Sequence, residues 1–363
     1  MAMTVPQFEP YLGEEEIAQV IDSIRGGWIT EGVKSQEFIK RLAALSGARY
    51  VSLAPNGTLA LFVALKVLGI KEGDEVIVPD FTFLASASSV VLTGATPVFV
   101  DVDNTFHARP ELIECAITKR TAAIMPVHIY GQAANMDAIM EIAKRHGLRV
   151  VEDAAQGVGV RYKGKQVGTF GDFGCFSFFA DKTITTGEGG ALLTDDPALA
   201  ETCLYFRNQG RLERGSFTHP HLGYNFRLTD IQAGIGLAQL DKLPEITEKK
   251  RKNEQLYRSF LADVQEVAFP AIDPDSERVP FRVNILVPDP VRLGSFLESR
   301  GVGVRRFFYP LHRQPCFTPQ NSRVAGEICG SIDAFDHGVS LPSSAKLTEH
   351  EIRYVCDCVR DFF

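Results

Sequence analysis

The stretch SFFADKTITTGEGG at residues 177–190 places one lysine, Lys182, in a loop rich in glycine and threonine. Apolar runs at 174–178 and 191–194 flank the loop, and both are typical of buried β-strands. Too few residues separate these runs for a helical crossover, so we expect the two strands to pair antiparallel. The lysine has no adjacent acidic residue other than Asp181. A lysine confined in such a loop can have a lowered pKa and form a Schiff base with an aldehyde cofactor.

Five more strand candidates precede this loop and alternate with helical patterns. The strands are expected at 50–53, 75–78, 97–102, 122–127 and 149–152. The helices are expected at 58–68, 84–92, 110–116 and 136–146. Alternating strands and helices indicate a parallel sheet, and strands that are apolar throughout indicate burial on both faces. We therefore predict an α/β fold with a seven-stranded, mostly parallel sheet.

A smaller domain is expected after this sheet. An apolar-periodic helix at 231–240 runs towards Pro244, and a charged helix follows to about residue 262. Beyond it, strand and helix patterns alternate at 281–287, 290–300, 303–308 and 348–363. We therefore divide the chain into a large domain at residues 1–243 and a small α+β domain at residues 244–363.

Composition and charge exclude several classes of protein. Of the 363 residues, 45% are hydrophobic, which is enough for a large core. A net charge of −7, from 45 acidic and 38 basic residues, argues against nucleic acid as a partner. The first ten residues show no secretory signal pattern, so we expect a cytoplasmic protein. The uncharged stretch at 81–100 is broken by Gly94 and Pro97, which argues against a membrane span.

The seven cysteines indicate neither disulfides nor a metal site. Their number is odd and no CxxC pair occurs, so we expect reduced thiols. Cys356 and Cys358 with His350, or the pair His219 and His221, lack the usual spacing of zinc ligands. We therefore expect no structural metal.

Two further features point to a cofactor that carries a phosphate. Asn56, Gly57 and Thr58 follow a strand and open a helix, where free N–H groups and a hydroxyl can bind a phosphate. An ordinary helix cap explains the same pattern. Glu152 and Asp153 end an apolar strand, and a buried carboxylate there needs a cationic partner such as a protonated pyridine. A helix cap or a salt bridge is the structural alternative.

Several short motifs follow one another in a fixed order along the chain. They are NGT at 56–58, VPDFTF at 78–83, PVHIYG at 126–131, EDAAQ at 152–156, FSFF at 176–179, KTITTGEGG at 182–190 and GYNFR at 223–227. With this ordered set, the chain resembles the DegT-like sugar-nucleotide aminotransferases from about residue 10 to the C-terminus. The resemblance implies the aspartate-aminotransferase fold, which is fold type I of the pyridoxal-phosphate enzymes. It also implies pyridoxal 5′-phosphate (PLP) as the cofactor.

The resemblance carries roles over to individual residues of the cofactor site. It implies that Lys182 holds the cofactor covalently and carries the proton, and that Asp153 pairs with the pyridine nitrogen. Gln156 would lie at the phenolic oxygen and Phe83 would stack on the ring. The phosphate cup would consist of Gly57, Thr58, Ser177 and, from the neighbouring subunit of a homodimer with shared active sites, Asn225.

Within that family, the sequences of three motifs are most similar to those of the sugar 4-aminotransferases. They are WIT at 28–30, the loop at 182–190, and YPLH at 309–312. This similarity implies glutamate as the amino donor and a 4-keto-6-deoxyhexose nucleotide as the acceptor. The candidates for the sugar side are Trp28, Thr30, His128, Tyr309 and His312. For the two histidines, a structural role is the alternative to substrate contact.

The chain also departs from that group. Ala180 and Asp181 stand where Gly and Asn usually precede the lysine, and Gln156 stands where an acidic residue is usual. The segment at 278–287 lacks the usual His and Tyr. These departures affect the identity of the nucleotide and sugar rather than the cofactor chemistry.

Four other functions are alternatives to this one. An acceptor with a 3-keto sugar is poorly separated from a 4-keto sugar by sequence. Dehydratases of the family carry histidine where this chain has Lys182. Intact Lys182, Asp153 and Ser177 argue against a regulator that binds the cofactor without turnover. No GxGxxG follows an early strand, which argues against a nicotinamide dehydrogenase.

Overall fold

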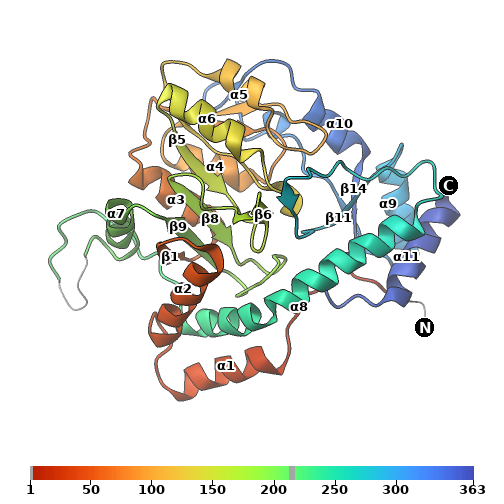
Figure 1. Cartoon of the computed structure of the whole chain (residues 1–363), viewed down its shortest axis with the longest axis horizontal. Helices are drawn as coiled ribbons and strands as arrows, with labels where there is room; N and C mark the ends of the chain where they lie inside the picture. Colours follow the sequence, from red (N-terminus) through yellow and green to blue (C-terminus); the bar gives the residue numbers. More distant parts are fainter. Residues whose placement is uncertain (1–2, 212–216) are drawn as a thin grey trace.

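An eight-stranded sheet forms the centre of the larger part of the molecule. The computed structural model describes residues 3–211 and 217–363 (Figure 1). In spatial order, the strands are β1 (Tyr50–Ala54), β9 (Gly190–Thr194), β8 (Phe173–Ser177), β5 (Arg149–Asp153), β4 (Thr121–Ile124), β2 (Glu75–Pro79), β3 (Thr96–Val100) and β13 (Arg323–Val324). Only β9 within this sheet of the described chain is antiparallel to its neighbours. The α/β class, the mostly parallel sheet and the antiparallel pair around Lys182 are thus confirmed.

The predicted number of seven strands is wrong by one. The eighth strand, β13, comes from the C-terminal third of the chain and pairs parallel with β3 at the edge of the sheet. It has only two residues, Arg323 and Val324, so it shows no alternation that a sequence pattern could reveal. Arg323 also ion-pairs with the buried Glu75 of β2 at 3.2 Å, which fixes this short strand beside the sheet.

Alternation along the strands divides the apolar side chains between two cores. Ile77 faces one core, which is covered by α2 (Val33–Ser46), α5 (Pro110–Ala116), α6 (Met136–His146) and the first part of α8 (Asp230–Phe260). Val76 and Val78 face the other core, which is covered by α3 (Gly57–Val67), α4 (Leu84–Leu92) and α7 (Pro197–Arg207). Because helices cover both faces, the strands need apolar residues at successive positions.

The longest helix, α8, links the sheet to the C-terminal part of the chain and crosses Figure 1 diagonally. The expected interruption at Pro244 is wrong, because the helix continues through this residue. Proline removes one backbone hydrogen bond, but packing on both sides compensates for the loss. Leu243 and Ile246 are buried, and Lys242 pairs at 2.7 Å with Glu16 of α1 (Glu14–Arg25). The division into domains at residue 243 stays a prediction, and it would fall inside this helix.

The C-terminal part has its own small sheet and core. Strands β11 (Val283–Leu286), β14 (Gly338–Leu341) and β12 (Arg305–Arg306) form an antiparallel sheet. Helices α9 (Pro290–Ser299) and α11 (Glu349–Phe362) share an apolar cluster with β11, β14 and the end of α8. Helix α10 (Gly330–His337) precedes β14 directly. The α+β character predicted for this part is thus confirmed.

The remaining elements are short. A third sheet consists of β10 (Ser276–Glu277), β6 (Arg161–Tyr162) and β7 (Lys165–Gln166), and two single-turn 3₁₀ helices are η1 (Ile129–Gly131) and η2 (Leu311–Arg313). Within the two described ranges, no helix combines the length and the apolar character needed to cross a bilayer.

Candidate active site

Asp153 and Ser177 lie at the carboxyl ends of neighbouring parallel strands. Asp153 ends β5 and Ser177 ends β8, and the two strands pair directly. The Asp153 carboxylate is buried and accepts hydrogen bonds from the Ser86 hydroxyl (2.6 Å) and the Ala155 N–H (3.1 Å). A buried carboxylate with so few donors is suited to a cationic partner. The carboxyl edge of a parallel sheet is also where open α/β folds bind ligands.

The start of α3 makes a narrow cradle against the same edge. A Cβ atom on Gly57 would lie 2.9 Å from the Ser177 Cβ, and a Cβ on Gly190 would lie 2.6 Å from the Asn56 carbonyl. Glycine is therefore required at both positions. The Asn56 side chain caps the helix by accepting the Leu59 N–H at 2.9 Å, so the first-turn N–H groups of Gly57 and Thr58 begin a regular helix beside Ser177. Such a helix start favours an anion, and the predicted phosphate-cup residues of this chain are thus brought together.

Lys182 follows the end of β8 and is largely buried. Its Nζ atom lies 3.7 Å from Asp181 Oδ1 and 4.5 Å from the ring centroid of Phe281. Burial is the main cause that lowers the pKa of Lys182 from its ordinary value, while Asp181 and Asp153 act in the opposite direction. A lowered pKa favours the neutral amine, which is the nucleophilic form. This chemistry fits an aldehyde cofactor.

Gln156 and Phe83 each keep part of the side chain available for a ligand. The buried Gln156 accepts the Tyr130 N–H with its Oε1 atom at 2.6 Å, which leaves its amide nitrogen as the donor end for a ligand oxygen. The ring of Phe83 is 58% exposed and contacts Phe308 edge to face at 6.1 Å between centroids. Both arrangements are compatible with the roles that the sequence predicts.

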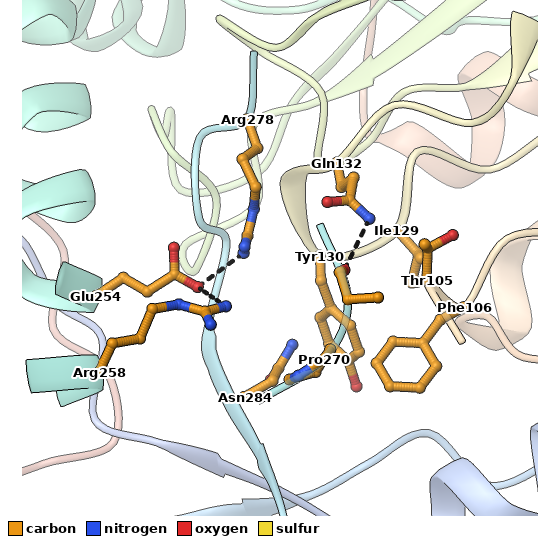
Figure 2. A pocket seen from close by; sticks show the side chains of 11 residues that line it. Thr105, Phe106, Ile129, Tyr130, Gln132, Glu254, Arg258, Pro270, Arg278 and Asn284 are labelled. Atoms are coloured by element: carbon orange, nitrogen blue, oxygen red, sulfur yellow. Dashed lines mark hydrogen bonds and ion pairs between the residues drawn. The ribbon is translucent and has the colours of Figure 1, made fainter. Parts of the chain in front are cut away.

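Tyr130 also borders a small cavity, which Figure 2 shows from close by. The cavity measures about 20 Å³ and has Glu254, paired with Arg278 and Arg258, on one side. Its volume suffices for a water molecule and not for a sugar. This cavity is therefore not a substrate site.

The residues predicted for the sugar side are more scattered. His312 donates its backbone N–H to Asp80 Oδ1 at 2.7 Å, and its Nδ1 atom lies 2.8 Å from Asp80 Oδ2, at the end of β2. Tyr309 is 40% exposed and its ring meets Phe335 edge to face. The exposed residues Trp28 and Thr30 lie between α1 and α2, far along the chain from these two.

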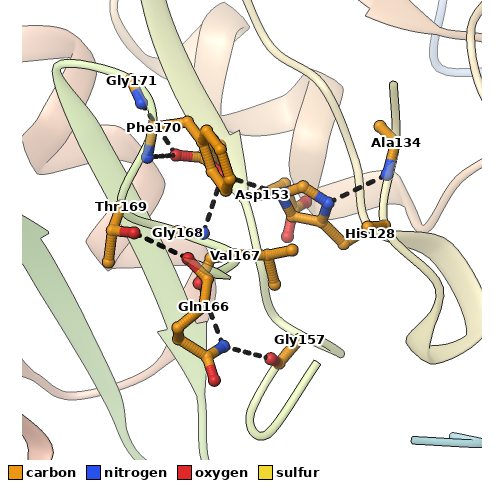
Figure 3. Close-up of polar contacts among 12 residues, drawn as sticks. His128, Ala134, Asp153, Gly157, Gln166, Val167, Gly168, Thr169, Phe170 and Gly171 are labelled. Atoms are coloured by element: carbon orange, nitrogen blue, oxygen red, sulfur yellow. Dashed lines mark hydrogen bonds and ion pairs between the residues drawn. The ribbon is translucent and has the colours of Figure 1, made fainter. Parts of the chain in front are cut away.

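His128 is held inside the fold. Its Nδ1 atom accepts the Ala134 N–H at 3.2 Å and its Nε2–H donates to Glu152 at 2.9 Å, and no part of the side chain is exposed (Figure 3). Glu152 also accepts the backbone N–H groups of Gly168, Phe170 and Gly171 at 2.6–2.8 Å. With both ring nitrogens engaged, this arrangement favours the structural alternative for His128, and its contact with the sugar stays a prediction.

Asn225 lies in a loop that packs on α3 of its own chain. The rings of Tyr224 and Phe226 meet the α3 residue Phe62 at 6.2 and 6.4 Å between centroids. The Asn225 carboxamide oxygen accepts a hydrogen bond from Arg227 Nε at 2.9 Å. Contact of Asn225 with a phosphate of a neighbouring subunit stays a prediction.

Several residues of this site were missed from the sequence. Ser86, Phe281 and Arg282 come from a helix and from the C-terminal part, and no motif marks them. The carboxylate of Asp181 is paired with Arg282 at 3.0 Å, so it is more than a neighbour of the lysine. In the described residues, no group of three or more His, Cys, Asp or Glu side chains is arranged to hold a metal ion.

Comparison with known proteins places these features in a family. A family model described as the DegT/DnrJ/EryC1/StrS aminotransferase family matches residues 10–360. A "GDP-perosamine synthase" of Escherichia coli O157:H7 is 38% identical over 366 residues, covering 99% of this chain and 98% of the relative. A "UDP-N-acetyl-3-dehydro-alpha-D-glucosamine 3-aminotranferase" of Acidithiobacillus ferrooxidans is 38% identical over 88% of this chain and 86% of the relative. The crystal structure of S. venezuelae DesV with a ketimine intermediate superposes with a TM-score of 0.93 at 34% identity, covering 99% of this chain and 98% of that one.

Proposed function

Because the chain belongs to the DegT/DnrJ/EryC1/StrS aminotransferase family, we propose that it transfers the amino group of glutamate to a nucleotide-linked 4-keto-6-deoxyhexose. The coarser part of this statement is established: the chain is a PLP-dependent sugar aminotransferase. The observation that carries the proposal is the meeting of Lys182, Asp153 and Ser177 at one edge of the sheet.

The residues present fit the cofactor, since the site offers a narrow cradle for a phosphate, a buried carboxylate and a lysine of lowered pKa. When bound, PLP supplies an electron sink for a carbanion at the donor's α-carbon. Asp153 would hold the proton on the ring nitrogen of the cofactor, and the Ser86 hydroxyl, which donates to the Asp153 carboxylate at 2.6 Å, keeps that carboxylate in place. The Nζ atom of Lys182 would accept the α-proton of the amino donor and pass it on to the cofactor within the same half reaction, and with the keto sugar it would carry a proton in the reverse direction. The expected kinetics are ping-pong.

Other residues position the cofactor. Gly57, Thr58 and Ser177 would bind the phosphate with N–H and hydroxyl groups, while Gln156 would donate to the phenolic oxygen. Phe83 would cover one face of the ring. In the homodimer that we propose, Asn225 from the partner subunit would complete the phosphate cup, so that each dimer has two identical shared sites.

A GDP-linked 4-keto sugar is our preferred acceptor. It is supported by the motifs at 28–30 and 309–312 and by a relative of matching length named GDP-perosamine synthase. Tyr309, His312, Trp28 and Thr30 are the residues that we propose for contact with the sugar nucleotide. A 3-keto acceptor is the second candidate, because another relative of equal identity is named as a 3-aminotransferase.

The direct test offers purified protein glutamate with four acceptors in parallel. These are the GDP-, UDP- and dTDP-linked 4-keto-6-deoxyhexoses and a UDP-linked 3-keto sugar, and the aminated product is identified by mass spectrometry. We expect the highest kcat/KM with the GDP-linked 4-keto sugar. Exclusive amination of the 3-keto sugar would establish the second candidate instead. Amination of any of the four excludes a regulator without turnover.

A further inference from the structure

A buried ion pair lies beside Lys182 and has no place in the chemistry described so far. Arg282, only 7% exposed, donates a hydrogen bond from Nη2 to Asp181 Oδ2 at 3.0 Å. The other oxygen of Asp181 is buried without a hydrogen-bond partner and lies 3.7 Å from Lys182 Nζ. One carboxylate thus faces both the reactive amine and a guanidinium, so Arg282 is close to the reacting atoms.

The geometry leaves most donors of Arg282 available. Among the described residues, Asp181 alone accepts a hydrogen bond from this guanidinium, which has five N–H donors. The guanidinium lies over the rings of Phe281 and Phe308, at 5.1 and 5.9 Å from Cζ to the ring centroids. The ring of Phe281 is the same ring that Lys182 Nζ approaches at 4.5 Å. Aromatic contacts hold the guanidinium in place without using its N–H groups.

Two other basic residues lie near this pair. Arg305 also approaches Asp181 Oδ2, at 3.9 Å. Lys250 of α8 is buried beside the pair, where its Nζ atom donates to the carbonyl groups of Phe281 and Ser343 at 3.3 Å each, and burial lowers its pKa to about 8. The Arg305 side chain is 54% exposed, and the buried Asp153 carboxylate also acts on Lys182, so Arg282 is the group of this cluster that is both buried and always charged. Its remaining N–H donors are therefore suited to an anion.

We propose that Arg282 binds a carboxylate of the amino donor beside Lys182, and that Asp181 holds the guanidinium in position from its other side. This inference rests on the proposed function, because it assumes that an amino acid is the donor. Arg282 is then a substrate-binding residue, and the C-terminal part of the chain contributes the recognition of the donor to a site built mainly by the large sheet.

The chemistry of the two substrates favours the donor over the sugar nucleotide as the anion. In an α-amino acid, the carboxylate is attached to the carbon that bears the amine, so it must lie beside the lysine during proton transfer. In the nucleotide sugar, the diphosphate is attached at C1, across the hexose ring from a keto group at C4. An anion site beside Lys182 therefore matches a carboxylate, and a diphosphate would bind farther out.

The test separates the two half reactions. PLP-loaded protein is mixed with glutamate without sugar, and the loss of visible cofactor absorbance in a single turnover gives the apparent Kd of the donor. The aminated form of the protein is then mixed with the keto sugar. In addition, glutarate, a dicarboxylate without an amine, is titrated by calorimetry, which measures binding without turnover.

Arg282→Gln should weaken the binding of both glutamate and glutarate by about 10- to 100-fold, the usual effect of losing a hydrogen bond between charged groups. The half reaction with the sugar should change by less than about threefold. Arg282→Lys should recover part of the affinity, because it keeps the charge and loses only the planar fork.

Two further variants distinguish a binding role from a structural one. Asp181→Asn leaves the guanidinium in place but removes the carboxylate that positions it, so it should weaken glutarate binding by less than Arg282→Gln does. Arg278→Gln removes a buried arginine of the same segment that pairs with Glu254 at 3.0 Å, and it should lower the melting temperature without changing the Kd of glutarate.

Three results would overturn the proposal. The first is that Arg282→Gln leaves the Kd values of glutamate and glutarate unchanged. The second is that Asp181→Asn weakens glutarate binding as much as Arg282→Gln does. The third is that Arg282→Gln impairs the half reaction with the sugar instead, which would assign the site to the diphosphate. If the unchanged protein binds glutarate but glutamate does not convert the cofactor, the proposed donor is wrong and the carboxylate site stands. If glutarate does not bind to the unchanged protein, the carboxylate site is wrong, whichever sugar is aminated.

Discussion

Glu152 and Asp153 are neighbouring carboxylates at the end of one strand, and the chain surrounds them very differently. Successive residues of a strand point to opposite faces of the sheet. Glu152 accepts three backbone N–H groups and the Nε2–H of His128, all within the same chain. Asp153 accepts only the Ser86 hydroxyl and the Ala155 N–H among the described residues.

The difference teaches how a structural carboxylate is told apart from a functional one. Both side chains are buried, so burial does not separate them. The number of hydrogen-bond donors from the chain separates them. The Glu152 carboxylate has all its acceptor positions filled by its own chain, while the Asp153 carboxylate can still accept hydrogen bonds beside Lys182. Substitutions on the two sides of β5 should therefore have different effects, on catalysis at Asp153 and on stability at Glu152.

The largest effect is expected for Lys182→Ala, on the Asp153 side of β5. The variant loses both the covalent attachment of the cofactor and the proton carrier, so turnover should fall by at least about 10³-fold. Visible absorbance of the bound cofactor should shift in the purified protein. The melting temperature without cofactor should stay close to that of the unchanged protein, since the loop lysine is not part of either core. Near-normal turnover would remove the basis of the assignment.

Asp153→Asn should lower the catalytic rate less than Lys182→Ala does. The amide cannot stabilise a proton on the ring nitrogen as a carboxylate does, so the half reaction with glutamate should slow by roughly 10²- to 10³-fold. The Kd of the sugar nucleotide should change little. An unchanged single-turnover rate would show that Asp153 is structural, as Glu152 is.

Glu152→Gln makes the same chemical change one residue earlier and should act on stability instead. The side-chain amide nitrogen of the variant would face backbone N–H groups that the Glu152 carboxylate accepts in the unchanged protein. We therefore expect the free energy of unfolding, measured with denaturant, to fall by about 2–4 kcal/mol. The protein that stays folded should keep its turnover. If Glu152→Gln instead lowered turnover at unchanged stability, the distinction by internal donors would be wrong.

A smaller effect is expected where the site depends on a second subunit. Lys182→Ala and Asn225→Ala proteins, each with little activity, are mixed under conditions of subunit exchange. If Asn225 reaches the partner's phosphate, a mixed dimer has one site with both defects and one with neither. Random exchange should then restore roughly a quarter of the activity of the unchanged protein. No recovery after demonstrated exchange would leave Asn225 as a residue that closes a turn within its own chain.

The sequence predicted the parts of this molecule that are local in the chain. The strands around Lys182, their antiparallel pairing and the large sheet all follow from short apolar runs and the lengths of the connections. Strand β13 and the continuation of α8 through Pro244 were missed, because both depend on partners distant in sequence. The same reason hid the contact of Asp181 with Arg282, because only the fold shows that their two segments meet.

The smallest effect is expected for Tyr309→Phe, on the sugar side of the site. The Tyr309 ring packs against Phe335 at 5.0 Å between centroids, and 40% of the residue is exposed. Removing the hydroxyl leaves the packing intact, and if Tyr309 contacts the sugar nucleotide as we propose, it deletes one neutral hydrogen bond worth about 1 kcal/mol. The KM of the sugar nucleotide should rise about fivefold while the half reaction with glutamate stays unchanged. Asp153→Asn should show the reverse pattern, so the two variants together divide the site into a part that performs the chemistry and a part that selects the acceptor. An equal loss in both half reactions of Tyr309→Phe would mean that this residue belongs to the cofactor side instead.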